Sequence, residues 1–152
     1  IERAKQCGLT DGIVVDKDPA VFVDAARRWT GGKGMDVILD LVGGPYMPAN
    51  VKSAALKGRV IVIGLVAGRE ANLDLGVILN QRLTVRGTAL RSRTPEERAD
   101  ATAGFAQDVL PLIERGAVKP VVDTVLPLDK IADAHRLMES NGTFGKIVLV
   151  HS

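Results

Sequence analysis

The stretch "DVILDLVGG" at residues 36–44 decides the fold. Residues 36–42 are mostly apolar and do not alternate with polar residues, which is typical of a strand covered on both faces of a parallel sheet. Gly43 and Gly44 follow directly, and ligands of open α/β sheets bind beyond the carboxyl ends of the strands. The pattern predicts a buried parallel strand that ends at a ligand. No G-x-G-x-x-G phosphate-binding motif occurs in the 152 residues.

Further strands alternate with helical segments along the chain. "RVIVIGL" (59–65) is a second continuous apolar strand and contains Gly64, whereas "LTVRGT" (83–88) alternates as a strand near a sheet edge does. Shorter strands are expected at 12–16, 125–128 and 146–150. This alternation of strands and helices predicts an α/β fold with a doubly wound parallel sheet.

The helices are indicated by apolar spacing and by their end signals. We expect helices at 1–7, at 20–30, from Pro45 or Pro48 to Lys57-Gly58, from Thr94 to Gly116 and at 129–139. "TPEE" (94–97) predicts a capping box in which Thr94 caps the helix and Glu97 completes the reciprocal bond. Pro111 should interrupt that helix, whose buried stripe is expected to consist of Phe105, Val109, Leu112 and Ile113.

Composition excludes several classes of protein. A net charge of +2 with interspersed basic and acidic residues gives no basic stripe for nucleic acid, and 3% aromatic residues make no base-stacking platform. No apolar run approaches the roughly 20 residues of a membrane span. The lone Cys7 cannot form an internal disulfide, which favours the reducing cytoplasm as the compartment of the protein. One cysteine and two dispersed histidines are too few to form a zinc site, so we expect none.

Two residues that often carry chemistry are interpreted here as structural. His135 shares an apolar helix face with Ile131, Ala134 and Met138, so we expect it to be buried. Cys7 is expected to be a small core residue. The glycines after the two apolar strands also have an alternative interpretation, as tight turns that need a positive φ.

Four stretches together resemble the medium-chain dehydrogenase/reductase superfamily, in particular its zinc-independent quinone oxidoreductase branch. They are "DVILDLVGG", "KGRVIVIGL", "GTALRSR" and "DKIADAHRLMESNGTFGKIVLV". The resemblance implies a C-terminal portion, in which the phosphate-binding loop belongs to an upstream segment. It further implies a partial Rossmann-type doubly wound parallel sheet (strands 3 to 6) with a C-terminal strand-helix-strand. Residues 1–118 would be the later part of the nucleotide-binding domain, and residues 119–152 would pack on an N-terminal barrel domain.

A missing pair of strands would leave sheet edges unpaired. In the strand order 3-2-1-4-5-6, strands 1 and 2 lie between 12–16 and 36–42. We expect the gap to be closed either by a shift of 12–16 next to 36–42 or by pairing between chains. The resemblance separately implies a homodimer joined through the strand at 83–88.

The resemblance implies which residues contact a nicotinamide cofactor. These residues are Val42, Gly43, Gly44, Gly64, Leu65, Val66, Leu90, Arg91, Asn141, Gly145 and Lys146. Arg91 and Arg93 have an alternative interpretation as solvated loop charges, and Lys146 has one as a surface lysine beside a strand. NADPH is expected on branch membership alone, with NADH as the open alternative; Lys17 would face a 2′-phosphate, but Asp16 and Asp18 oppose that interpretation.

The implied function is that of an NADPH-dependent quinone oxidoreductase, which transfers hydride to a quinone or a conjugated carbonyl. No catalytic residue is assigned within the chain, and the chain alone is expected to be inactive. The alternatives are a 2-enoyl thioester reductase of the same superfamily, a non-catalytic α/β binding module, and a structural role like that of lens crystallins.

Overall fold

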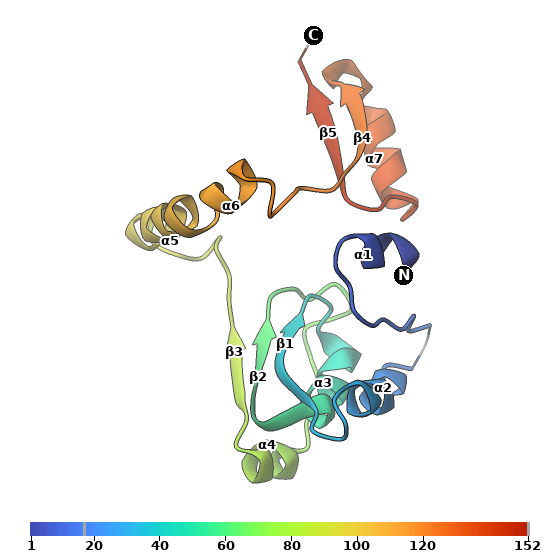
Figure 1. The fold of residues 1–152 in the computed structure, drawn as a ribbon, viewed down its shortest axis with the longest axis vertical. Coiled ribbons are helices and arrows are strands. Elements are labelled where there is room, and N and C mark those ends of the chain that lie inside the picture. The colour runs from blue at the N-terminus through green and yellow to red at the C-terminus, as the bar shows by residue number, and fades with distance from the viewer. Residues whose placement is uncertain (17, 152) are drawn as a thin grey trace. The chain divides into compact units, whose positions relative to one another are not determined.

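The computed structural model describes residues 1–16 and 18–151. The chain divides into two compact units, Ile1–Ser92 and Arg93–Ser152, and each is described by itself. The first unit contains α1 (Glu2–Gln6), α2 (Val21–Trp29), β1 (Met35–Asp40), η1 (Gly44–Tyr46), α3 (Met47–Ser53), β2 (Ala54–Val62), α4 (Leu75–Gln81) and β3 (Thr84–Gly87) (Figure 1). The second contains α5 (Pro95–Asp108), α6 (Leu110–Glu114), β4 (Val122–Pro127), η2 (Leu128–Lys130), α7 (Ile131–Glu139) and β5 (Lys146–Val150).

The first unit is built on a parallel three-stranded sheet in the order β1-β2-β3. This sheet confirms the three strands predicted at 36–42, 59–65 and 83–88, and it places the last of them at an edge. The strands are in register at their carboxyl ends, where Asp40 pairs with Val62 and Val62 pairs with Gly87. The chain therefore has the mixed α/β fold with parallel strands that the sequence predicts.

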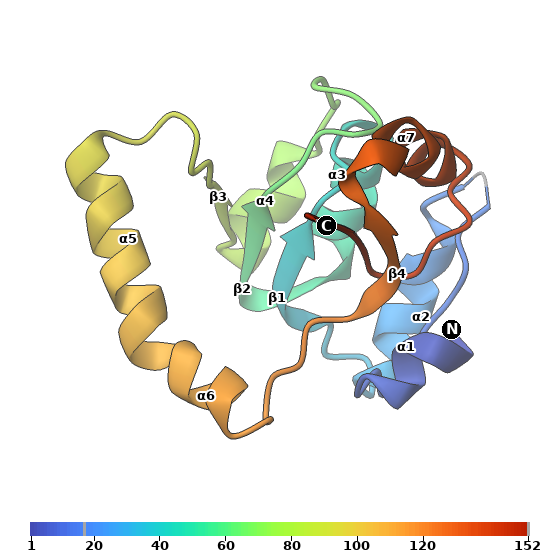
Figure 2. The same ribbon diagram turned by 90° about the horizontal axis from the view of Figure 1, so that it is seen from above.

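One face of the sheet carries the core. Helices α3 and α4 pack against it and α2 packs on α3 (Figure 2). The buried cluster consists of Met47, Val51, Ala54 and Val60. On the other face Leu39 and Leu41 are 61% and 60% exposed. The sequence predicts strands that are covered on both faces. Within the first unit, only one face of the sheet is covered.

The prediction of a strand at 12–16 is wrong. Residues 11–15 have no regular secondary structure, and Val14 is 73% exposed. A parallel strand exists only through hydrogen bonds to a neighbour, and within the described part of the chain β1 pairs with β2 alone. The expected shift of this segment next to β1 is therefore also wrong, whereas pairing between chains stays a prediction.

The helix predicted to reach Lys57-Gly58 ends earlier, at Ser53. Ala54 and Ala55 are buried and already extended as the start of β2, in an irregular stretch of the β1–β2 ladder. Lys57 has a φ of 61°, which no helix accommodates. Burial of these two alanines at the start of β2 overrides their helical propensity.

The second unit begins with the predicted capping box. The Thr94 side chain accepts a hydrogen bond from the Glu97 N–H (3.2 Å), and the Glu97 carboxylate accepts one from the Thr94 N–H (3.0 Å). The helix is interrupted at Val109, two residues before Pro111, as predicted. Its expected stripe is not buried within this unit, because Phe105 is 48% exposed and α5 and α6 have no buried residue.

Strands β4 and β5 form a parallel pair against which α7 packs, which confirms the C-terminal strand-helix-strand. On α7 only Ala134 is buried, so the prediction of a buried His135 is wrong: the residue is exposed, as are Ile131 and Met138. Cys7 is likewise exposed rather than in the core. Both predictions required a covered helix face, and neither unit covers that face by itself. The domain boundary at residue 118 stays a prediction.

Candidate functional site at the carboxyl ends of the strands

The carboxyl ends of β1, β2 and β3 bring three connecting segments together. The carbonyl of Asp40 accepts hydrogen bonds from Ile63 N (2.7 Å) and Gly64 N (3.1 Å), and the carbonyl of Val62 accepts one from Thr88 N (3.0 Å). These contacts extend the ladders past the last strand residues. The segments that follow β1, β2 and β3 therefore start at one edge of the sheet.

Asp40 fixes the first turn at this edge. Its side chain is only 4% exposed, and its Oδ1 accepts hydrogen bonds from Val42 N (2.8 Å) and Gly43 N (2.9 Å). Its Oδ2 is buried and has no hydrogen-bond partner among the described residues. The sequence prediction missed this residue, although an acidic side chain inside an apolar strand three residues before a glycine pair is a recognisable signal.

The predicted residues Gly43, Gly44 and Gly64 meet in this turn. A Cβ on Gly64 would lie 2.4 Å from the Leu41 carbonyl oxygen, and one on Gly43 would lie 2.7 Å from Leu65 Cδ2. A Cβ on Gly44 would lie 2.9 Å from the Ala67 carbonyl oxygen. The close approach of these chain segments is sufficient to explain why glycine occupies the three positions. This agrees with the alternative interpretation of the glycines as tight turns. Gly43 and Gly44 are buried by this approach, and Gly64 is half-buried.

The predicted Val42, Leu65 and Val66 lie in the same edge. Val42 is half-buried and its carbonyl accepts a hydrogen bond from Ala67 N (2.9 Å), which joins the turn after β1 to the loop after β2. Val66 is 90% exposed and Leu65 is 44% exposed. The structure thus brings six of the predicted cofactor residues together: 42–44 and 64–66.

A hollow of about 440 Å³ opens between the ends of β2 and β3. Its apolar wall consists of Val62, Ile63, Leu65 and Ala89, next to Gly87. Two hydroxyl side chains, those of Thr88 and Ser92, complete the lining. Leu90 and Arg91, which the sequence predicted at this place, are exposed in the same segment but do not line the hollow.

Asn141, Gly145 and Lys146 belong to the second unit. A Cβ on Gly145 would lie 2.5 Å from the Val121 carbonyl oxygen, and Lys146 N donates to that oxygen at 2.8 Å. Asn141 has a φ of 53° in the turn after α7. Glycine at 145 thus allows the chain to pass close to Val121 at the start of β5. Contact of Asn141, Gly145 and Lys146 with a cofactor bound at the glycine-rich edge stays a prediction.

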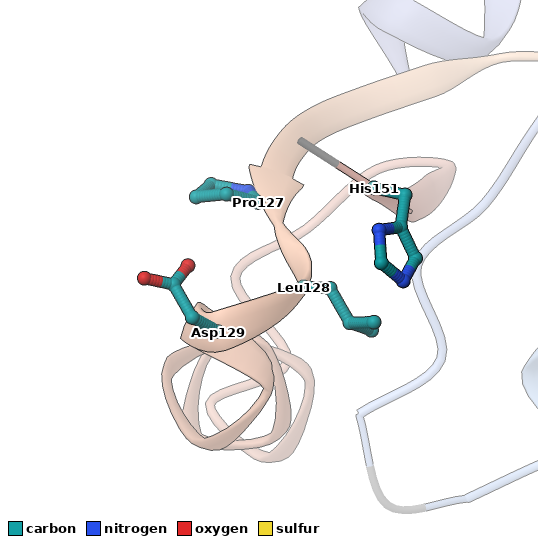
Figure 3. Close-up of a pocket in the computed structure, with 4 residues that line it drawn as sticks. All are labelled: Pro127, Leu128, Asp129 and His151. Atoms are coloured by element: carbon teal, nitrogen blue, oxygen red, sulfur yellow. The ribbon is translucent and has the colours of Figure 1, made fainter.

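The second unit has a hollow of its own, of about 470 Å³, at the carboxyl ends of β4 and β5. Figure 3 shows its lining, in which Asp129 and His151 lie on opposite sides of Leu128. An acid–base pair requires hydrogen-bond reach between the two groups. Among the described residues, no hydrogen bond or ion pair joins Asp129 to His151.

The described residues contain neither a cluster of metal ligands nor a helix that could span a membrane. Within 1–16 and 18–151, no three His, Cys, Asp or Glu residues are grouped so that they can hold a metal ion. In the same part of the chain, every helix is too short or too polar to cross a bilayer. Lys17, named as a candidate for a 2′-phosphate, lies outside the described residues.

The fold and this edge define a class of protein. Parallel strands with crossover helices, ending in a glycine-rich edge, are the Rossmann-type arrangement of dinucleotide-binding domains. Residues 11–149 match the family described as zinc-binding dehydrogenase. The chain belongs to this family, within the medium-chain dehydrogenase/reductase superfamily that the sequence resembles.

Individual proteins are similar over nearly the whole chain. A quinone oxidoreductase of Rattus norvegicus is 32% identical over 152 residues, which cover 98% of this chain and 44% of that protein. An NAD-dependent alcohol dehydrogenase of known crystal structure is 32% identical with a TM-score of 0.77, covering 99% of this chain and 40% of that one. The JamJ enoyl reductase shares the fold at 20% identity, with a TM-score of 0.80 over 100% of this chain and 44% of that one. The chain thus spans less than half the length of these relatives.

The family description names zinc, but the described residues do not fit a zinc site. Zinc requires three or four His, Cys, Asp or Glu ligands in one place, and no such group is present among these residues.

Proposed function

We propose that this chain is the part of an NADPH-dependent quinone oxidoreductase that holds the nicotinamide end of the cofactor. The observation that carries the proposal is the convergence of the turns after β1, β2 and β3 at one sheet edge, beside an apolar hollow. The similarity to a quinone oxidoreductase over 98% of the chain supports the same reaction class.

The turn after β1 would contact the cofactor through backbone atoms of Val42, Gly43 and Gly44. Asp40 holds this turn in place through its hydrogen bonds to two of their N–H groups. Because Gly43 and Gly44 carry no Cβ, the turn lies close against the loop after β2, and the two segments together would form the edge that receives the ligand. Gly64, Leu65 and Val66 would contact the ligand in the same way from the end of β2.

Leu90 and Arg91 would border the site on the β3 side, and Asn141, Gly145 and Lys146 would approach it from the second unit. When bound, NADPH supplies the hydride for reduction of a quinone or a conjugated carbonyl. The residues of this chain would position the ring and keep water from it with apolar side chains such as Ile63 and Leu65. We assign no proton transfer to the chain.

The exposed edge strand β3 supports a homodimer. Among the described residues it pairs only with β2, and all four of its residues are exposed. An unpaired parallel edge presents N–H and C=O groups to a second chain. We propose that the segment 83–88 joins two subunits.

The longest gene product that contains this chain provides the test. Nicotinamide fluorescence is titrated with that protein, and its turnover is then compared on a panel of quinones and of 2-enoyl thioesters with NADPH and with NADH. NADPH-dependent quinone turnover is expected. Reduction of enoyl thioesters alone would assign the alternative reductase activity, and an absence of cofactor binding would support a non-catalytic module.

A further inference from the structure

The hollow between β2 and β3 has a lining that neither turn glycines nor backbone contacts explain. Ile63 and Leu65 are 43% and 44% exposed at this place, although both are large apolar side chains. All lining residues are uncharged. An uncharged concave surface with exposed apolar side chains is suited to a neutral ring and not to a phosphate.

Thr88 and Ser92 are the polar side chains of this lining. Within the described part of the chain, neither hydroxyl makes a hydrogen bond to another residue. Thr88 is held in place by its own N–H, which donates to the Val62 carbonyl, so its side chain is anchored at the last rung of the ladder. Both residues are exposed, so their hydroxyls are open to a ligand. Sparse polar groups beside an otherwise apolar hollow are the kind that orient a ligand.

We propose that the hydroxyls of Thr88 and Ser92 recognise a carbonyl group carried by a planar ring bound in this hollow. The ring rests on Ile63, Leu65 and Ala89, and the hydroxyls donate hydrogen bonds to its carbonyl oxygen. They are positioning residues, because they orient the ring and take no part in bond making. The proposal rests on the proposed function, and it assigns the β3 side of the site to Thr88 and Ser92 in addition to Leu90 and Arg91.

Two molecules of the proposed reaction carry such a carbonyl: the cofactor, in its carboxamide, and the quinone substrate. The shared chemistry is a ring-bound C=O group. Thr88→Val and Ser92→Ala remove one hydroxyl each, while Thr88→Ser keeps the hydroxyl. Thr102→Ala is the control, since it removes a hydroxyl from α5, outside both the hollow and the proposed subunit contact.

The measurements are made on the longest gene product that contains this chain, after circular dichroism has shown that each variant is folded. Loss of one hydrogen bond should weaken binding about three- to tenfold. If the carboxamide is the partner, the Kd of NADPH rises by this factor in Thr88→Val and Ser92→Ala. If the quinone is the partner, its KM rises while the Kd of NADPH is unchanged. Thr88→Ser, which keeps the hydroxyl, should restore both values to within about twofold, and Thr102→Ala should leave them within the same range.

A thionicotinamide analogue of the cofactor separates a positioning role from a structural one. Sulfur is a weaker hydrogen-bond acceptor than oxygen. If the carboxamide is the partner, the effect of Thr88→Val should therefore shrink with the analogue, which a merely structural defect would not show. Unchanged values for NADPH and quinone in both hydroxyl variants of an active protein would overturn the proposal. Failure of the unsubstituted protein to bind NADPH would instead overturn the proposed function.

Discussion

The carboxylate of Asp40 and the backbone of Gly43 are joined at 2.9 Å, in a hydrogen bond that fixes the glycine-rich turn at the end of β1. The same oxygen accepts a second hydrogen bond, from Val42 N. One buried side chain therefore holds two donors of the turn that we propose contacts the cofactor.

Replacement of Asp40 tests this relationship. Asp40→Ala leaves two backbone N–H groups without their acceptor, and we expect the free energy of unfolding to fall by about 2–3 kcal/mol. Asp36→Ala on the same strand removes only an exposed ion pair with Lys33 and should cost less than about 0.5 kcal/mol. Urea unfolding of both variants measures the difference. Equal losses in the two variants would show that Asp40 does not hold the turn.

Gly64 is required where two chain segments touch. In Gly64→Ala the new Cβ would meet the Leu41 carbonyl at 2.4 Å, so the backbone must move, and we expect a loss of stability of about 1–3 kcal/mol. Gly104→Ala is the control, because Gly104 lies in α5 and nothing stands within 4 Å of its added Cβ. This control should gain about 0.5–1 kcal/mol from lower chain entropy. Thermal unfolding of both variants provides the comparison.

The exposed edge of β3 predicts the effect of a proline. Thr88 N points to β2, and alternation along a strand then directs the N–H of Val85 to the open edge. Val85→Pro removes that outward donor and leaves the β2–β3 ladder intact. Light scattering coupled to size exclusion should find dimers before the substitution and monomers after it. A dimer that persists would place the subunit contact elsewhere.

The cap of α5 predicts a dependence on pH. The Glu96 backbone N–H and the Thr94 hydroxyl hold the pKa of the Glu96 carboxyl below its ordinary value of 4.5. A lowered pKa in the folded state means that this contact stabilises the helix above pH 4.5 and that its contribution is lost as the pH falls through the lowered value.

NMR titration of the Glu96 carboxyl measures this shift. In Thr94→Ala the pKa of Glu96 should move toward 4.5, and the helix should lose about 1 kcal/mol of stability at neutral pH. Thr102→Ala in the same helix, where the hydroxyl donates to the Arg98 carbonyl, should not change the pKa of Glu96. An unchanged pKa in Thr94→Ala would remove the hydroxyl as a cause.

Local signals predicted the elements whose stability is local. The capping box at Thr94 and the break before Pro111 depend on a few neighbouring residues, and both are confirmed. The apolar strand at 36–42 was also recognisable, because a run without alternation has few other uses in a parallel sheet. Predictions that needed a distant partner failed: the strand at 12–16 lacks a neighbour, and His135 lacks a covering surface within its unit.

The site was predictable only in part for the same reason. Glycines after two strands indicated the edge, but their contacts with Leu41, Leu65 and Ala67 appear only once β1 and β2 are in register. Asp40 was missed because acidic residues are seldom buried. Thr88 and Ser92 were missed because hydroxyl residues are frequent in loops, and only the hollow distinguishes these two.

Hydrogen exchange with and without NADPH tests the central claim most directly, in the longest gene product that contains this chain. Added NADPH should slow exchange in the segments 42–46, 63–68 and 88–92, because these lie at the proposed cofactor edge. Exchange in α5 should not change. Protection confined to other parts of the protein, with these three segments unaffected by saturating NADPH, would contradict the account.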